Sequence, residues 1–228
     1  MSLAAAALIG TAAVTGGPAM AQVAPTAAEA AAYTSLHAAA QKGDVAKIDR
    51  LATARAELNA RDGNGRTPLH VAAFARQREA IRALARAGAD INLLDRDRYD
   101  GVTIASVADD EETLRVLLAS GASAKLVTSR YDGTALIAAA HLGHDGVVKQ
   151  LIAAGAPLDH VNNLHWTAAI ESVVLGNGGP RHQETLRALI NAGANLQLSD
   201  RQGNTPLQLA KSRGYREMVQ MLEQAGAR

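Results

Sequence analysis

One stretch of this chain decides its fold, residues 61–73, which read Arg-Asp-Gly-Asn-Gly-Arg-Thr-Pro-Leu-His-Val-Ala-Ala. Its two glycines supply the positive φ that a tight turn needs, at little steric cost. Thr67 can cap the start of a helix, and Pro68 fits the first helical turn because the N–H that it lacks would have no partner there. The stretch therefore predicts a turn that leads into a helix. Residues 200–210 repeat the pattern as Asp-Arg-Gln-Gly-Asn-Thr-Pro-Leu-Gln-Leu-Ala.

Two markers indicate that this unit recurs along the chain. Alignment on the capping residue gives Thr34, Thr67, Thr103, Thr134, Thr167 and Thr205. Alignment on the position after the second helix, where glycine is the preferred stop, gives Arg55, Gly88, Gly121, Gly155, Gly193 and Gly226. Both series advance by about 33 residues, a period typical of stacked helical repeats. The sequence thus predicts a solenoid whose unit is turn, helix, helix and glycine stop.

The chain resembles the ankyrin repeat family. The resemblance is carried by residues 65–73, Gly-Arg-Thr-Pro-Leu-His-Val-Ala-Ala, and 88–92, Gly-Ala-Asp-Ile-Asn, with support from Gly143 and His144. It implies an all-α ankyrin-repeat solenoid of about six helix-turn-helix repeats with short hairpin loops, which covers residues 33–228. We expect the repeats at residues 33–60, 61–93, 94–126, 127–158, 159–196 and 197–228.

Copies three and five depart from the pattern. If copy three is aligned on Thr103, its hairpin at residues 95–101 is three residues longer than that of copy two, and its helix pair is three residues shorter. Copy five has five extra residues at 175–182, where three glycines and a proline predict a loop between its two helices. Such a loop can carry function or can be a tolerated insertion.

The N-terminal segment predicts export. Residues 1–21 combine a short apolar stretch with Ala19-Met20-Ala21, which matches a secretory signal with cleavage before Gln22, although no Lys or Arg precedes the apolar run. We expect a linker at residues 22–32 and a periplasmic or secreted protein. The alternative is an Ala-rich tail on a cytoplasmic protein. The absence of cysteine is compatible with an oxidising compartment.

Composition agrees with a solenoid and argues against two classes of partner. The chain is 48% hydrophobic but only 3% aromatic, so its core must be built from Ala, Leu, Val and Ile. Small alanines let helices stack closely in thin layers. The formal net charge is +1 with both signs interspersed, so we expect neither nucleic-acid binding nor membrane insertion of the mature chain.

No motif for enzymatic chemistry stands out. By the resemblance, His37, His70 and His144 support hydrogen bonds between neighbouring loops. His141 and His144 have a spacing that could hold a metal, but a second pair of ligands is missing. We therefore expect no catalytic residues, no cofactor and no metal site.

By the resemblance, the hairpin tips and the first helices of the repeats line a concave surface that recognises protein partners. The only Trp, the only Phe and two of the four Tyr fall there, and aromatic and arginine side chains dominate interface energetics. The candidate protein-binding residues are Arg66, Phe74, Tyr99, Arg130, Tyr131, His141, Leu164, Trp166 and Arg201. The alternative is that Tyr99, Tyr131 and Trp166 only pack between adjacent hairpins.

These observations predict a monomeric, non-enzymatic module that presents a rigid concave surface to a protein of unknown identity. The resemblance extends to exported bacterial ankyrin proteins, some of which protect against oxidative stress. One alternative is an immunity or antitoxin-like protein that blocks a toxin. An alternative of another class is a small-ligand or metal-binding protein that uses the loop of copy five and its histidines.

Overall fold

The computed structural model describes residues 22–228, so the predicted export signal at residues 1–21 lies outside the described residues. Within that range thirteen helices form and no strand does. None of these helices has the length and apolar character needed to span a bilayer. Their bounds are α1 Ala27–Ala32, α2 Ser35–Lys42, α3 Val45–Thr53, α4 Pro68–Phe74, α5 Arg78–Arg86, α6 Gly101–Val107, α7 Glu111–Ala119, α8 Ala135–Leu142, α9 Asp145–Ala153, α10 Ala168–Val174, α11 Pro180–Asn191, α12 Pro206–Arg213 and α13 Arg216–Gln224.

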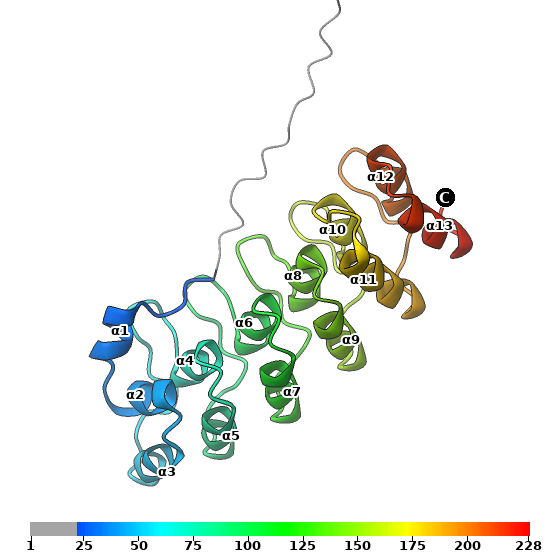
Figure 1. Ribbon diagram of the computed structural model, residues 1–228. Coiled ribbons are helices and arrows are strands. Elements are labelled where there is room, and N and C mark those ends of the chain that lie inside the picture. The colour runs from blue at the N-terminus through cyan, green and yellow to red at the C-terminus, as the bar shows by residue number, and fades with distance from the viewer. Residues whose placement is uncertain (1–21) are drawn as a thin grey trace, which may run out of the picture.

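Helices α2 to α13 form six antiparallel pairs that stack into a curved rod (Figure 1). The even-numbered helices from α2 to α12 pack on one another in one row, and the odd-numbered helices from α3 to α13 pack in a second row. The even-numbered row lies on the inner side of the curve (Figure 1). The predicted all-α solenoid of six helix pairs is confirmed.

The inner helices begin as the sequence predicts, with one difference in copy three. Thr67, Thr134, Thr167 and Thr205 occupy the N-cap positions of α4, α8, α10 and α12. In α6 the N-cap is Asp100, whose carboxylate accepts a hydrogen bond from the backbone N–H of Thr103. The expected start at Thr103 was therefore wrong. Asp caps helices as well as Thr does, so copy three has a hairpin of normal length.

The outer helices end at the predicted positions. Gly88, at the end of copy two, has φ +96°, a left-handed conformation that glycine adopts without strain. In copy one Arg55 takes this position with φ +58°. A side chain in that conformation is strained, which explains why the other five copies have glycine there.

The core runs continuously through the stack and consists mainly of alanine and branched aliphatic side chains. The predicted buried residues of copy two, Leu69, Ala72, Ala73, Ile81 and Leu84, are all at most 3% exposed. Alanines on the inner helices allow neighbouring layers to approach closely, so the scarcity of aromatic residues follows from the architecture.

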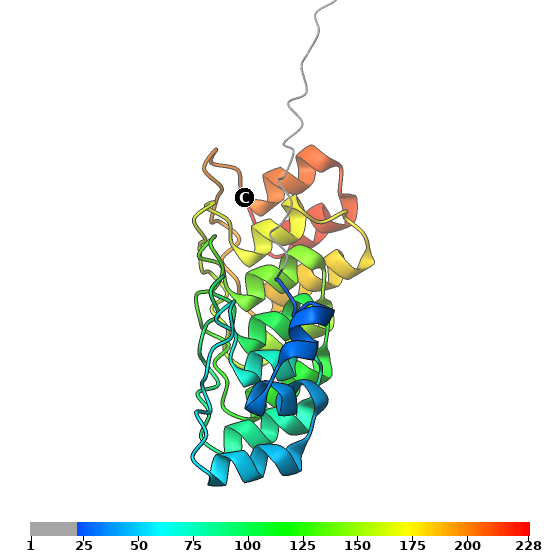
Figure 2. The same cartoon turned by 90° about the vertical axis from the view of Figure 1, so that its left-hand side faces the viewer.

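The hairpins run along one side of the rod (Figure 2) and are joined to one another by backbone hydrogen bonds. Arg96 N–H donates to Asn64 O at 3.0 Å, Ser129 N–H to Arg98 O at 2.9 Å, and Asn163 N–H to Tyr131 O at 2.9 Å. This ladder fixes the hairpins of repeats two to five relative to one another. Together with the inner helices the hairpins form the concave surface on which the candidate residues were predicted.

Candidate protein-binding surface

The structure corrects the role predicted for Arg66. Its side chain is only 1% exposed, so it is not available to a partner in this conformation. Its Nε donates to Asp62 Oδ2 at 2.7 Å, its Nη2 to Glu29 Oε1 at 2.9 Å, and its Nη1 to Val23 O at 3.1 Å. Both Glu29 and Val23 belong to the segment predicted as a linker. The chain's own N-terminal segment therefore covers Arg66.

That segment, residues 22–32, is called the N-terminal arm below. Its helix α1 begins with a capping box in which the side chains of Thr26 and Glu29 each accept a hydrogen bond from the other's backbone N–H. Figure 1 shows α1 on the inner side of the rod, beside α2 and α4. The pattern Thr-x-x-Glu is a sequence signal for a helix start, and it could have indicated this helix.

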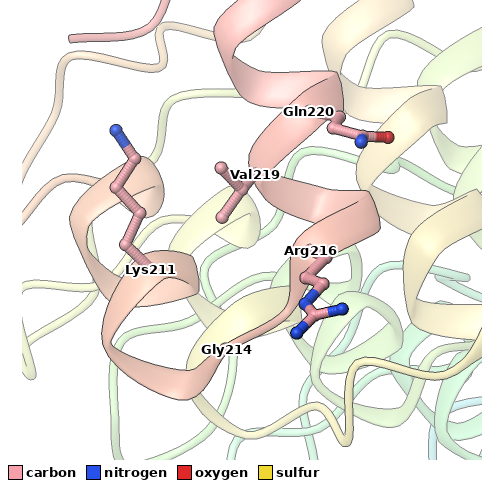
Figure 3. Close-up of a pocket in the computed structure, with 5 residues that line it drawn as sticks. All are labelled: Lys211, Gly214, Arg216, Val219 and Gln220. Atoms are coloured by element: carbon pink, nitrogen blue, oxygen red, sulfur yellow. The ribbon is translucent and has the colours of Figure 1, made fainter.

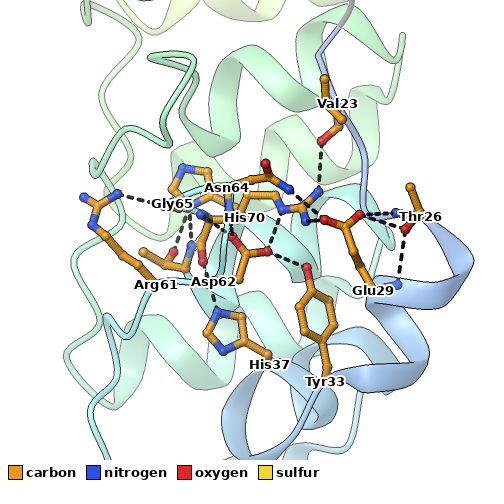
Figure 4. A network of polar contacts seen from close by, with 12 residues as sticks. Val23, Thr26, Glu29, Tyr33, His37, Arg61, Asp62, Asn64, Gly65 and His70 are labelled. Atoms are coloured by element: carbon orange, nitrogen blue, oxygen red, sulfur yellow. Dashed lines mark hydrogen bonds and ion pairs between the residues drawn. The ribbon is translucent and has the colours of Figure 1, made fainter.

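A polar network holds the base of the arm against the first two repeats (Figure 4). Tyr33 donates from its hydroxyl to Asp62 Oδ2 at 2.6 Å, and Asn64 Nδ2 donates to Glu29 Oε1 at 2.7 Å. Burial alone would raise the pKa of the Asp62 carboxyl, but hydrogen bonds from Tyr33 and Arg66 outweigh it and lower this pKa to about 2. Burial and the hydrogen bond to Asp62 raise the pKa of the Tyr33 hydroxyl.

Phe74 lies at the end of α4, where its side chain is half-buried. It lines a cavity of about 220 Å³ together with Ala73, Ile104 and Ala105, and Gln22 of the arm lines the same cavity. The arm therefore contacts the concave surface both at Arg66 and beside Phe74.

Tyr99, Arg130 and Tyr131 lie on the third and fourth hairpins. Tyr99 is half-buried and packs against the core, and burial together with Asp97 raises the pKa of its hydroxyl. Tyr131 is half-buried and Arg130 is exposed. An ion pair of 2.8 Å between Arg98 and Asp132 links the two hairpins. Tyr99 therefore packs as the alternative interpretation requires, whereas Arg130 remains accessible.

The second half of the concave surface carries exposed apolar side chains. Leu142 ends α8 with 40% of its surface exposed, Leu175 follows α10 with 41%, and Leu164 on the fifth hairpin has 37%. Trp166, on the same hairpin, is half-buried against the core. We name His141, Leu142, Leu164, Trp166 and Leu175 the C-terminal patch.

The sequence reasoning missed Glu171, which lies beneath this patch. Its side chain is buried within α10, and its Oε1 accepts a hydrogen bond from Asn162 Nδ2 at 3.1 Å. Its Oε2 lies 3.4 Å from His141 Nδ1. A charged residue inside the apolar run Ala168-Ala169-Ile170-Glu171-Ser172-Val173 was the available signal.

Arg201 is exposed on the last hairpin, where its Nη2 donates to Asn163 O and so ties this hairpin to its neighbour.

A shallow depression of about 330 Å³ lies at the end of the rod between α12 and α13, lined by Lys211, Arg216 and Val219 (Figure 3). In inner repeats the next helix pair would cover this face. We assign no ligand to the depression.

The segment of copy five that contains its extra residues connects this repeat to the repeats before and after it. His182 Nε2 lies 3.0 Å from His141 O, and the Tyr215 hydroxyl donates to Gly176 O at 3.0 Å. Arg181 reaches past copy four to Asp109 at 2.8 Å. His182, the histidine of this segment, therefore contacts a backbone carbonyl. Across residues 22–228 no group of three or more His, Asp or Glu side chains is arranged to hold a metal ion.

The remaining histidines mostly bridge neighbouring repeats. His37 Nε2 lies 3.0 Å from Arg66 O, His70 Nε2 lies 3.0 Å from Tyr99 O, and His144 Nδ1 lies 2.8 Å from Ser106 O. The structural role implied by the resemblance is confirmed for all three. His160 makes the same kind of contact with Asp132 O at 2.6 Å, whereas His165 is exposed.

Stacked helix pairs with a laddered concave surface define a solenoid scaffold for protein interactions. Models for ankyrin repeats match residues 12–95, 131–163 and 180–223. The chain belongs to the ankyrin repeat family, whose arrays are protein-interaction modules on a typically non-enzymatic scaffold.

Three relatives illustrate this membership. The ankyrin repeat protein YahD of Escherichia coli (strain K12) is 38% identical over 100 residues, which is 43% of this chain and half the length of YahD. A crystal structure of an ankyrin repeat domain from Acinetobacter baumannii AYE is 44% identical, with a TM-score of 0.80 over 85% of this chain and 98% of that one. The ankyrin repeat protein EF0377 is 32% identical, with a TM-score of 0.77 over 84% and 98% of the two chains.

Proposed function

We propose that the C-terminal patch is the surface with which this protein captures a protein partner. The observation that carries the proposal is the coincidence of three exposed leucines and the chain's single tryptophan on the open half of the concave surface. A monomer gains nothing from exposing Leu142, Leu164 and Leu175, whereas a partner that covers them buries apolar surface. Because hydrogen bonds between hairpins already fix the backbone, little ordering accompanies binding.

A capture experiment with matched variants tests this proposal. The chain from Gln22 onward is used as bait in an envelope extract, and Trp166→Ala and Leu142→Ala are compared with Arg115→Ala, which changes an exposed residue of the outer helix α7. We expect the first two to lose at least tenfold of the captured partner while Arg115→Ala retains it. Melting temperatures are measured in parallel. If Trp166→Ala lowers the melting temperature and leaves capture unchanged, the residue packs and does not bind.

We also propose that the protein is exported to the periplasm, with a stress-protective role as the functional context. Support comes from the signal-like pattern of residues 1–21. N-terminal sequencing of the protein from cells tests export. Gln22 as first residue is expected, and an intact Met1 contradicts the proposal.

A further inference from the structure

We infer that Arg66 and Asn64 form a docking site for an acidic peptide segment, which the N-terminal arm occupies as an internal ligand. The inference rests on the proposed function in one respect, because both assign partner binding to the concave surface. It adds a second contact area, at the opposite end of the rod from the C-terminal patch, and it states the chemistry of the ligand.

The site recognises two features of the arm. Arg66 Nη2 and Asn64 Nδ2 converge on one oxygen, Glu29 Oε1, at 2.9 and 2.7 Å, while Arg66 Nη1 binds the backbone carbonyl of Val23 at 3.1 Å. The carbonyl belongs to the non-helical residues before α1 and the carboxylate belongs to α1, so the site suits a peptide that is extended and then turns into a helix. A free anion would satisfy two of these three donors and leave Arg66 Nη1 without its carbonyl partner.

The donor groups are held in place from behind, by residues outside the arm. Asp62 accepts from Arg66 Nε at 2.7 Å and also from the backbone N–H groups of Asn64 and Arg66, at 2.8 and 2.9 Å. Tyr33, at the base of the arm, donates its hydroxyl to the same carboxylate. Arg66 therefore keeps its orientation when Glu29 leaves, and a site that needs no rearrangement binds with a smaller entropic cost.

The arm itself is held weakly. Helix α1 has no buried residue, Val23 is 51% exposed, and the side chain of Glu29 is 36% exposed. The capping box satisfies the start of α1 internally, so this end needs no partner from the repeats. Release of the arm would uncover Arg66 just before the start of α4 and, at the other end of α4, the cavity that Phe74 and Gln22 line. The uncovered cation suits the one acidic residue of the arm, Glu29, which lies within a small apolar sequence.

Two labelled peptides test the site. One has the sequence of the arm, residues 22–32, and the other carries Gln in place of Glu29. They are titrated against the full chain, against the full chain with Glu29→Gln, and against a control with Glu217→Gln, which changes an exposed residue of α13. In the unchanged chain the tethered arm competes at an effective concentration of the order of millimolar. We expect Glu29→Gln to raise the affinity for the acidic peptide about tenfold, and Glu217→Gln to leave it unchanged.

Within the Glu29→Gln chain, the acidic peptide should bind about tenfold more tightly than the Gln peptide. The further change Asn64→Ala should reduce this preference several-fold without lowering the melting temperature. Equal affinities for the two peptides would overturn the inference. So would a dimer whose formation requires Glu29, because the arm would then exchange between copies.

The two proposals fail separately. If peptide discrimination is absent but Trp166→Ala still loses the captured partner, only the Arg66 site is wrong. If the peptides are discriminated and Trp166→Ala keeps the partner, only the role of the C-terminal patch is wrong.

Discussion

At the scale of single residues, His70 shows how one side chain joins two repeats. Its Nδ1 accepts from the backbone N–H of Thr67 at 3.1 Å, so its Nε2 carries the proton that it donates to Tyr99 O at 3.0 Å. The bond from Thr67 requires the neutral ring, because a protonated Nδ1 cannot accept a hydrogen bond. Burial lowers the pKa of His70, which is consistent with this state.

We therefore predict that stability falls as the pH drops below the ordinary histidine pKa of about 6.5, because the unfolded chain binds the proton more readily than the folded one. The measurement is urea unfolding between pH 8 and about 5. His70→Gln is the matched variant, because Gln208 at the equivalent position caps Thr205 N–H at 2.8 Å without titrating. The fall should be shallower in His70→Gln, and an identical fall in both proteins would contradict the assignment.

The second prediction concerns the contribution of Asp62 to stability at more acidic pH. Its folded pKa of about 2 lies below the unfolded value of about 3.9. A depressed carboxyl pKa stabilises the fold above the unfolded pKa, and this stabilisation is lost as the pH falls from about 4 to about 2. At pH 7 the lowered pKa of Asp62 contributes on the order of 2 kcal/mol to the free energy of unfolding. Asp62→Asn should be less stable at pH 7 and should show a smaller loss over this range by urea unfolding. A loss of the same size in both proteins would assign it to other carboxyl groups.

The residue scale is also where sequence reasoning was least complete. The pattern placed Arg66 at a position typical of partner contact, and nothing local in residues 61–73 shows that Glu29 comes back to cover it. That contact joins residues 37 positions apart. It depends on the path of the arm, which a repeat period does not determine.

At the scale of elements, the period predicts more than the local signals do. The helix pairs and their glycine stops follow from spacing, and so does the core of copy two. Copy three shows the limit. Thr103 matched the capping residue by type, but Asp100 lies 33 residues after Thr67 and performs the capping. Where a residue type and the period disagree, the period is the better guide, because the stacked layers must remain in register.

The predicted loop of copy five, residues 175–182, gives the prediction for this scale. The structure corrects its extent, because Pro180, Arg181 and His182 form the first turn of α11. His182 packs over Gly143 and Gly176, where an added Cβ would lie within 3 Å of its ring, and its Nε2 bonds to His141 O. His182→Ala removes this hydrogen bond and the packing, so we expect a loss of about 1–3 kcal/mol. The measurement is urea unfolding.

Arg181→Gln is the contrasting variant. The ion pairs of Arg181 with Asp109 and Asp145 are on the surface, and its side chain is 53% exposed. We therefore expect Arg181→Gln to change the free energy of unfolding by no more than about 1 kcal/mol. If His182→Ala is as mild as Arg181→Gln, the loop is a tolerated insertion and does not brace the repeats.

At the scale of the whole molecule, stability is the sum of repeat units and the interfaces between them, because each helix pair packs only on its neighbours along the rod. Leu151 of α9 is fully buried in the fourth repeat, and Leu222 of α13 is fully buried in the last. Truncation to alanine costs about 2–5 kcal/mol at either position. The consequences should differ, because Leu151 has repeats on both sides and Leu222 on one.

We predict that Leu151→Ala weakens the coupling between the two halves of the rod, so that urea unfolding broadens or separates into two transitions. Hydrogen exchange followed repeat by repeat should then show faster opening in repeats four to six than in one to three. Leu222→Ala should accelerate exchange in the last repeat alone and leave the main transition intact. If both variants shift one cooperative transition equally, the rod unfolds as a single unit. The C-terminal patch and the Arg66 site would then have the same free energy of unfolding. Release of the arm would in that case be coupled to the C-terminal half of the rod.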